Sequence, residues 1–506
     1  MAPRHTVVLV PTWGSGHFMS ALEAGKRLLA AGGGAFSLTV LVMHAPTQAK
    51  ASEVEGHVRR EAATGLDIRF LQLPAIEHPA DCVGHTQSAS RYGQLYAPHV
   101  KAAIAGLASS SRVAALVVDF FFTALFDVAH ELAVPAYVYF ASPAAFLALM
   151  LRLPALRDDL TGPGFEEMDA AVDVPGLPPV PPSYMPVCLV RYYDLLEYHG
   201  RRFMEARGVI VNTTVELEAS VLAAIAAGRC VPGRPAPALH AIGPGDLARP
   251  QRQPPTASRV REVAAGLERS RHRFLWVLRG PPVAGTRFAT DANLLPEGFL
   301  EATAGRGLVW PEWAPQSEIL SHAAVGGFVT HCGWNSVMES LWFGVPMVPW
   351  PLYGEQHLNA FELVAGVGAA VALEMDRKKG FFVQAEQLER AVRSLMDGGS
   401  EEGRKAKAKA SELSAEFRRA VGEGGSSRAA LQRLVGEILD SPDRRAPPMP
   451  ARTISGTVPP QHRGRLTVVL LAGLPAPPRC SSSRPKTTIP TAPGCLSSPS
   501  AAHSSP

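Results

Sequence analysis

The sequence predicts an α/β protein made of two doubly wound domains, each a largely parallel β-sheet covered by helices. Short β-rich runs alternate with helical stretches along most of the chain, a pattern typical of parallel sheets because crossover helices join their strands. The same alternation starts again in the second half. The length of 506 residues is sufficient for two domains of ordinary size.

The first domain, residues 1–243, opens as a strand, a loop and a helix. His5–Val10 is β-rich, Pro11–Gly16 is punctuated by glycine, and Met19–Ala31 has the periodicity of an amphipathic helix. Further strands are predicted at Phe36–Met43, Leu66–Leu73, Ala115–Asp119, Ala136–Phe140 and Val209–Asn212. Helices are predicted at Ala97–Ser109 and Thr123–Leu132, and a proline-rich loop at Val174–Pro186.

The second domain, residues 259–440, repeats this order. Its predicted strands are Arg273–Leu278, Gly307–Trp310, Gly326–Thr330 and Val345–Pro349. Its predicted helices are Arg259–Ser270, Gln384–Met396, Gly403–Glu423 and Arg428–Leu439. We expect the last helix to pack back against the first domain.

The second domain lacks an opening strand. Residues 244–258, which join the domains, contain no β-run before the helix at Arg259. The first strand of a doubly wound sheet is central, so its loss would leave neighbouring backbone groups unpaired. The apolar run Leu466–Leu474 could supply a replacement, but we expect the tail that contains it to be disordered.

That tail, residues 441–506, differs in composition from the rest of the chain. It carries 14 prolines with many serines and arginines, which cannot bury a core. It also holds eight of the 49 basic residues and one of the 45 acidic residues. The chain's net charge of +4 therefore comes from the tail, and the body offers no basic surface for nucleic acid.

The remaining composition is that of a soluble globular protein, with 46% hydrophobic and 19% charged residues. No segment approaches the ~18 consecutive apolar residues of a membrane span. Six cysteines are scattered without a CxxC pair, which favours a reducing compartment. We expect a cytosolic monomer without stable membrane insertion.

The segment Trp313–Gln356 suits a nucleotide sugar. The strand Gly326–Thr330 runs into a glycine-containing turn and a helix start, for which Asn335 or Ser336 is the expected N-cap. Such a helix start directs free N–H groups at a phosphate, and His331 could add a further donor. An exposed Trp313 could stack on a flat base. Each of these residues alone is more often structural, whereas their joint spacing favours binding.

The carboxylates and amides of this segment suit hydroxyl groups. Glu339, one turn into the helix, could accept hydrogen bonds from a ribose. Glu355 and Gln356 follow an apolar strand and offer acceptors and a donor for a sugar. No Asp-x-Asp pair or cluster at metal-ligand spacing occurs, so we expect no metal ion and no cofactor.

His17 and Asp119 are the predicted catalytic pair. Both follow strands, so both should emerge at the carboxyl edge of one parallel sheet. A histidine has a suitable pKa for a general base, and a buried carboxylate behind it fixes its tautomer. Structural capping roles are the alternative. Ser142, after Ala136–Phe140, is a further candidate for a sugar contact.

These motifs resemble those of plant family-1 UDP-dependent glycosyltransferases, over about residues 5–440. The resemblance implies a GT-B fold, in which two Rossmann-like domains face each other across a cleft. It implies that the histidine and aspartate deprotonate the acceptor, with inversion at the sugar. The UDP-sugar site that it implies consists of Trp313, Ala314, Gln316, His331, Gly333, Trp334, Asn335, Ser336, Glu339, Glu355 and Gln356. Among these, the final glutamine favours UDP-glucose over UDP-galactose.

Flanking sequences such as GHRRFMEARGVIVNTTVELE resemble the subgroup that acts on flavonoids, anthocyanidins, chalcones and simple phenols. We therefore expect a UDP-glucose-dependent O-glucosyltransferase that takes a small phenolic acceptor. The family normally has a strand and a serine loop at the diphosphate where this chain has residues 244–258. An inactive or non-catalytic remnant of the fold is the alternative. A nicotinamide oxidoreductase is disfavoured because GxGxxG is absent.

Overall fold

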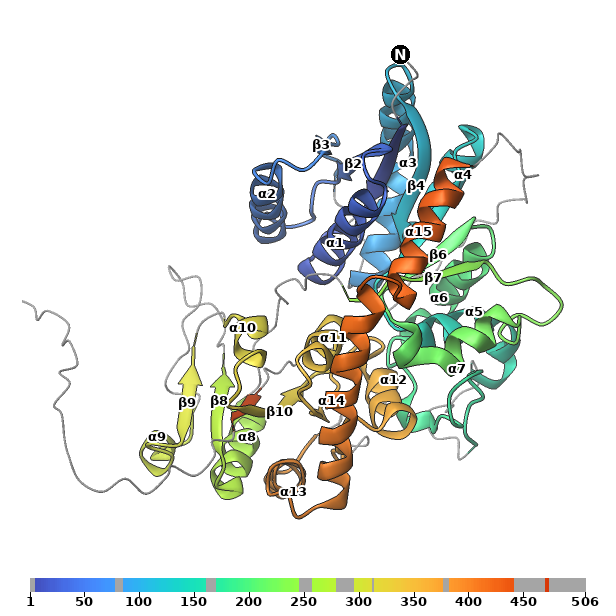
Figure 1. The fold of residues 1–506 in the computed structure, drawn as a ribbon. Helices are drawn as coiled ribbons and strands as arrows, with labels where there is room; N and C mark the ends of the chain where they lie inside the picture. Colours follow the sequence, from blue (N-terminus) through green and yellow to red (C-terminus); the bar gives the residue numbers. More distant parts are fainter. Residues whose placement is uncertain are drawn as a thin grey trace, which may run out of the picture. The chain divides into compact units, whose positions relative to one another are not determined.

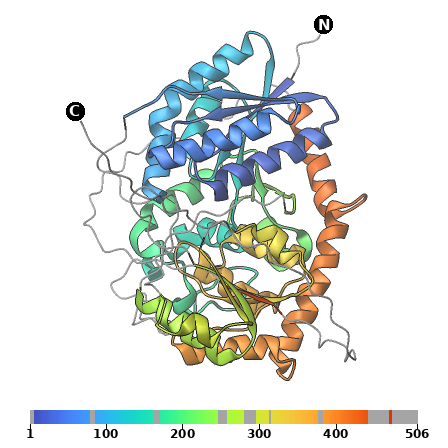
Figure 2. The same ribbon diagram turned by 90° about the vertical axis from the view of Figure 1, so that its left-hand side faces the viewer.

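A computed structural model describes residues 5–77, 85–160, 170–244, 257–278, 295–311, 314–375, 382–440 and 469–472. The chain divides into two compact units, Met1–Gly473 and Leu474–Pro506. All of the described residues belong to the first unit, whose helices and strands are drawn in Figures 1 and 2.

The first sheet has seven parallel strands in the order β3-β2-β1-β4-β5-β6-β7. Their bounds are β1 His5–Val10, β2 Phe36–Val42, β3 Ile68–Gln72, β4 Arg112–Asp119, β5 Ala136–Phe140, β6 Gly208–Val211 and β7 Ala238–Ala241. The order runs outward in both directions from β1 and β4, which confirms the predicted doubly wound sheet. Its strands are largely buried, as their continuous apolar sequences indicate.

The helices that accompany this sheet are α1 Ser15–Ala31, α2 Gln48–Ala62, α3 His85–Ala108, α4 Phe126–Glu131, α5 Ala144–Leu160, α6 Leu189–Phe203 and α7 Val215–Ala226. Helix α1 begins four residues before the predicted start at Met19, and α3 continues through Pro98 instead of starting near it. Pro98 removes one backbone donor from α3, and the helix accommodates this loss.

The second sheet has five strands in the order β11-β10-β12-β8-β9. Their bounds are β8 Arg273–Val277, β9 Gly307–Trp310, β10 Val325–Thr330, β11 Met347–Pro349 and β12 Val469–Ala472. Residues 245–256, where the sequence predicts that the opening strand is missing, lie outside the described residues. The expectation of a wholly disordered tail is wrong for Val469–Ala472, because β12 pairs antiparallel with both β8 and β10. The rest of 441–506 lies outside the described residues.

The second sheet is accompanied by α8 Ala257–Ser270, α9 Phe299–Ala302, α10 Gln316–Leu320, α11 Trp334–Trp342, α12 Gln356–Phe361, α13 Ala385–Met396 and α14 Glu401–Val421. The last helix, α15 (Ser426–Leu439), lies beside α1 on the first sheet. Its Leu431 and Leu434 line a small apolar cavity with Val7 and Leu9 of β1. The chain therefore returns to its first sheet after building the second.

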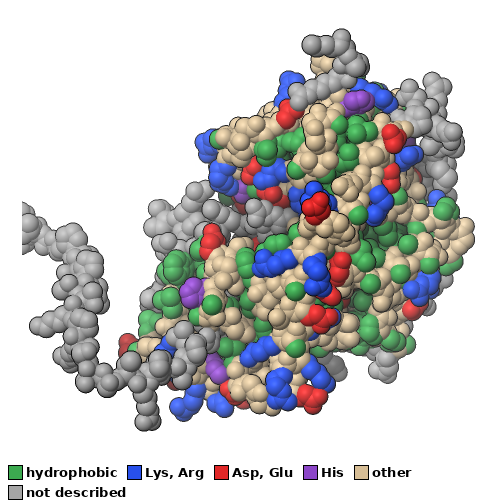
Figure 3. All heavy atoms as spheres, in the orientation of Figure 1, with side chains coloured by type: hydrophobic (Ala, Val, Ile, Leu, Met, Phe, Trp, Pro, Cys, Tyr) green, Lys and Arg blue, Asp and Glu red, His purple; other side chains and the backbone are tan. Residues whose placement is uncertain are grey.

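Acidic and basic side chains alternate on the face in Figure 3 instead of forming a basic patch there. Among the described residues, no helix is both long and apolar enough to cross a membrane.

Candidate active site

The carboxyl edges of the two sheets meet. Asn212, directly after β6, donates from Nδ2 to Oδ1 of Asn335 in α11 at 3.0 Å. Asn335 in turn donates from Nδ2 to the carbonyl of Gly16, in the first turn of α1, at 3.0 Å. Ser142, after β5, donates to Oε1 of Glu355, which precedes α12, at 3.4 Å. The loops that follow the strands of both sheets therefore form one site, the predicted location.

His17 and Asp119 lie at this edge and are hydrogen-bonded. Nδ1 of His17 is 2.7 Å from Oδ2 of Asp119. Gly14, with φ of 111°, is the N-cap of α1 and places His17 in the first turn of the helix. Asp119 is the last residue of β4 and is completely buried, whereas the His17 side chain is 23% exposed. The predicted pair thus has one buried member and one that reaches the surface of the site.

The electrostatics of the pair suit a histidine that acts as a base and is oriented by a carboxylate. Burial disfavours the imidazolium, but the charge of Asp119 and its hydrogen bond outweigh burial and raise the pKa of His17. Burial likewise disfavours the Asp119 carboxylate, yet His17 and the backbone N–H of Phe121, 3.0 Å from Oδ1, lower its pKa. With Nδ1 donating to the carboxylate, Nε2 carries the lone pair that can accept a proton.

Glu355 lies close enough to His17 for its charge to help raise the pKa of the imidazole. Burial raises the pKa of Glu355 itself, against the opposing effects of His17 and of Ser142. Ser142 is 5% exposed, and its hydrogen bond to Glu355 links the two halves. The sequence predicted it as a sugar contact, and the structure places it beside the predicted sugar-binding carboxylate.

The turn from β10 into α11 is shaped by two residues. Cys332 has φ of 61°, an uncommon conformation for a residue with a side chain. Gly333 is the N-cap of α11, so the predicted N-cap at Asn335 or Ser336 is wrong. A Cβ atom at Gly333 would lie 2.4 Å from Nε2 of His331, so the glycine lets the imidazole lie over the backbone at the helix start.

Trp334 is 3% exposed and its Nε1 donates to the carbonyl of Asn212 at 2.6 Å. Its indole therefore joins the two halves of the site, and any contact with a diphosphate would come from its backbone N–H. Asn212 was not among the predicted site residues. Its position after a strand of the first sheet was the only sequence signal that could have found it.

Gln316, Ser336 and Glu339 form a buried group beside this turn. Nε2 of Gln316 donates to Oγ of Ser336 at 3.1 Å and to Oε2 of Glu339 at 2.7 Å. Ala314 lies two residues before α10, and Trp313 lies outside the described residues. The residues expected to hold the ribose are thus brought together from two helices.

These geometries coincide with a family match. The model of the family "UDP-glucoronosyl and UDP-glucosyl transferase" matches residues 253–407. Malvidin galactosylase of Oryza sativa subsp. japonica is 55% identical over 473 residues, covering 86% of this chain and 98% of that protein. The chain belongs to this family.

Other members of the UDP-glycosyltransferase family show the same correspondence. The anthocyanidin 5,3-O-glucosyltransferase of a Rosa hybrid cultivar is 36% identical over 85% of this chain and 98% of that protein. The solved structure of Phytolacca americana UGT2 with UDP-2fluoro-glucose and pterostilbene has a TM-score of 0.74 at 31% identity. It covers 87% of this chain and 100% of that chain, so the GT-B fold predicted from the resemblance is confirmed.

Gln356, a predicted sugar-binding residue, uses its side-chain oxygen for hydrogen bonds to the backbone. Its Oε1 accepts from the backbone N–H groups of Leu352 and Tyr353 at 2.9 and 3.0 Å. The side-chain carbonyl is therefore engaged within its own loop, and the amide nitrogen is the group oriented away from these donors.

Proposed function

We propose that this UDP-glycosyltransferase is an inverting O-glucosyltransferase that moves glucose from UDP-glucose to a phenolic hydroxyl of a flavonoid, anthocyanidin or chalcone. The hydrogen bond between His17 and Asp119 carries the proposal. We further propose that it acts in the cytosol as a monomer. Three described cysteines, Cys188, Cys230 and Cys332, are free thiols, which suits a reducing compartment.

In the proposed reaction, Nε2 of His17 removes the proton from the acceptor hydroxyl. The acceptor oxygen attacks the anomeric carbon as the bond to the UDP oxygen breaks, so one displacement inverts the configuration. Asp119 stabilises the imidazolium that forms. The departing diphosphate is held by His331 and by the N–H groups at the start of α11.

The donor proposal rests on Gln356 and Glu355. The amide nitrogen of Gln356 supplies a donor and Glu355 supplies acceptors for the hydroxyls of the sugar, with Ser142 beside them. The similarity to a malvidin galactosylase makes UDP-galactose the direct competitor to test.

The experiment is to express the full chain and incubate it with UDP-glucose or UDP-galactose and a panel containing an anthocyanidin, a chalcone and a simple phenol. Mass spectrometry should detect the glucoside, with turnover at least about tenfold faster than with UDP-galactose. Nuclear magnetic resonance should show a β-linkage from the α-linked donor. Faster transfer of galactose would overturn the donor assignment.

An inactive remnant is the second candidate function, favoured by the lack of a β-run in the sequence of residues 244–258, before α8. It predicts that UDP binds without turnover. Its test compares the chain with a version in which the family's strand and serine loop are restored between residues 244 and 257. Equal turnover by the two proteins would exclude it.

A further inference from the structure

Strand β12 occupies the centre of the second sheet, although it comes from the end of the described chain. Val469, Leu470, Leu471 and Ala472 face Trp276, Leu275, Phe274 and Arg273 of β8. On the other side, Leu470 faces Phe328 and Val469 faces Val329 of β10. Both neighbours are antiparallel to β12 in a sheet whose other pairs are parallel.

Without β12, the sheet would consist of two separate pairs, β8 with β9 and β10 with β11. A strand with neighbours on both sides engages its backbone donors and acceptors in the two ladders, and the same holds for the facing edges of those neighbours. Isolated two-stranded ribbons are at best marginally stable. The second sheet therefore depends on the strand between β8 and β10.

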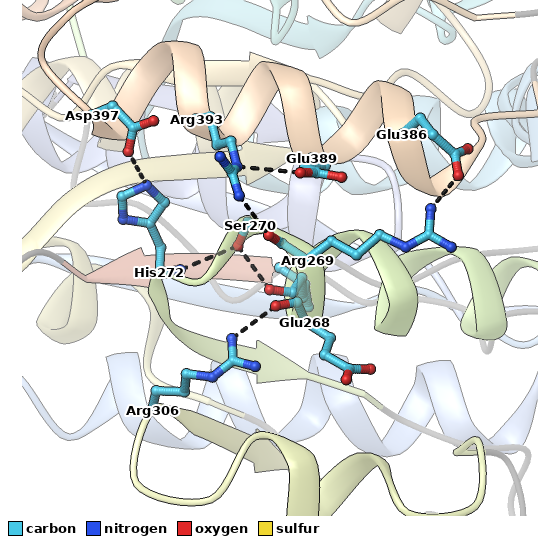
Figure 4. Close-up of polar contacts among 10 residues, drawn as sticks. Glu268, Arg269, Ser270, His272, Arg306, Glu386, Glu389, Arg393 and Asp397 are labelled. Carbon is cyan, nitrogen blue, oxygen red and sulfur yellow. Dashed lines mark hydrogen bonds and ion pairs between the residues drawn. The ribbon is translucent and has the colours of Figure 1, made fainter.

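On one side of β12, the segment that leads into β8 is held in place by contacts that do not involve β12. Figure 4 shows this polar network at the turn from α8 into β8. His272 binds Oδ1 of Asp397 at the end of α13 at 2.7 Å. Arg306 donates to the carbonyl of Glu268 at 2.9 Å, and Arg393 to that of Arg269 at 3.0 Å. These bonds attach the end of α8 and the turn before β8 to α13 and to the turn before β9.

On the other side of β12, strand β10 is held in place by its pairing with β11 and by the packing of Val329 and Val348 in the core of the second half. The space between β8 and β10 is thus one strand wide and bounded by elements held in place from outside. Strand spacing is about 4.8 Å, so only an extended segment fits.

We propose that this space is a strand-binding site whose occupant is Val469–Ala472 of the same chain. The C-terminal segment thereby supplies a central strand that the sequence of residues 244–258, which contains no β-run, does not offer, and it completes the second sheet. The segment pairs antiparallel with both neighbours, a direction that needs no crossover helix.

The same chain is the favoured donor of the strand. Twenty-eight residues separate Asp440, at the end of α15, from Val469. At up to about 3.3 Å per residue they can span roughly 90 Å, so length does not force exchange between molecules. A tethered segment also has an effective concentration of about millimolar, well above that of a second copy.

The strand-binding site lies next to His331, a predicted phosphate-binding residue. Val469 pairs with Val329, and His331 follows β10 directly after Thr330. Loss of β12 would first release the end of β10 that positions His331 and the start of α11. The tail is then an element on which donor binding depends.

The first test is cross-linking of the full chain with Arg273→Cys and Ala472→Cys, which face each other in the register. Oxidation should give an intrachain disulfide, located by mass spectrometry, at least about tenfold faster than in a control with Arg273→Cys and Ser482→Cys. Equal rates would overturn the proposal. A covalent dimer would overturn the same-chain occupant and assign the strand to a second copy.

The second test is hydrogen exchange of the full chain carrying Leu470→Pro, which removes a ladder donor and places a ring in the strand. Amides of β8 and β10 should exchange about tenfold faster or more, while those of β1 and β4 keep their rates. Leu474→Pro, outside the strand, is the matched control and should change neither set. Unchanged protection in β8 and β10 would overturn the proposal. Both tests are independent of turnover, so their outcome is separate from that of the proposed function.

Discussion

A hydrogen bond of 3.0 Å between Asn212 and Asn335 is one of the contacts that join the two halves of the candidate active site. Asn212 follows β6 of the first sheet, and Asn335 lies in the first turn of α11, where the diphosphate is expected. The carbonyl of Asn212 also accepts from the Trp334 indole. One residue of the first half thus orients two consecutive residues of the turn that we propose to bind the diphosphate.

We predict that Asn212→Ala weakens UDP binding. Removal of the amide leaves Oδ1 of Asn335 without this donor, at a cost of about 1–2 kcal/mol, or roughly five- to thirtyfold in Kd. Isothermal titration calorimetry with UDP measures the change. Gln94→Ala, an exposed amide on α3, is the control and should bind as the parent does. Unchanged affinity in Asn212→Ala would show that the turn is fixed by other contacts.

Turnover should fall at acid pH as His17 becomes protonated. The Asp119 charge raises the pKa of His17, so the acid limb should have its midpoint above the ordinary imidazole value of about 6.5. Asp119→Asn should lower kcat by about 10²–10⁴-fold and shift the midpoint downward, because the stabilising charge is gone. The pH profile of kcat measures both effects.

Asp173→Asn, at a carboxylate that is 76% exposed, is the control for Asp119→Asn. It should retain the kcat and the pH profile of the parent. If Asp119→Asn left the midpoint in place while kcat fell, Asp119 would not act through the protonation of His17.

Gln356→Glu should separate sugar recognition from nucleotide binding. The substitution keeps an oxygen to accept from Leu352 and Tyr353 but removes the amide donor. We expect kcat/KM for UDP-glucose to fall by about ten- to a hundredfold, since a buried hydroxyl loses its partner. The Kd for UDP, which has no sugar, should stay within about twofold. An equal loss in both would place the effect in the loop and not at the sugar.

The sequence predicted the fold and the proximity of His17 and Asp119 because both depend on local patterns. Strands β1, β5 and β9 have the predicted bounds, and His17 and Asp119 meet because each follows a strand of one parallel sheet. The start of α11 was misplaced because the positive φ of Cys332 is not encoded by a glycine or asparagine there. The role of Asn212 depends on how the two sheets meet, which no local pattern specifies. The run Leu466–Leu474 was named as a replacement strand but disfavoured, because composition predicts disorder for its surroundings, while pairing with β8 and β10 is a long-range effect.

A buried pair of acids predicts a loss of stability at alkaline pH. Glu218 of α7 and Glu362, which follows α12, are each 2% exposed and hydrogen-bonded to each other. Glu218 also accepts from the backbone N–H groups of Ala144 and Ala145 at the start of α5, so it is the member suited to carry the charge. Burial, and then the charge of Glu218, raise the pKa of Glu362 well above its ordinary value.

Because the folded state holds a proton on Glu362 that the unfolded chain releases, the stabilisation is present below the unfolded pKa and is lost as pH rises through the folded pKa. Glu362→Gln keeps a neutral donor in this position. It should therefore reduce, by about 2–4 °C, the fall in unfolding midpoint as pH rises above the ordinary glutamate pKa, measured by calorimetry. Glu412→Gln, at an exposed carboxylate of α14, is the control and should follow the parent curve. A Glu362→Gln curve parallel to that of the parent would mean that the pair is not protonated in the folded state.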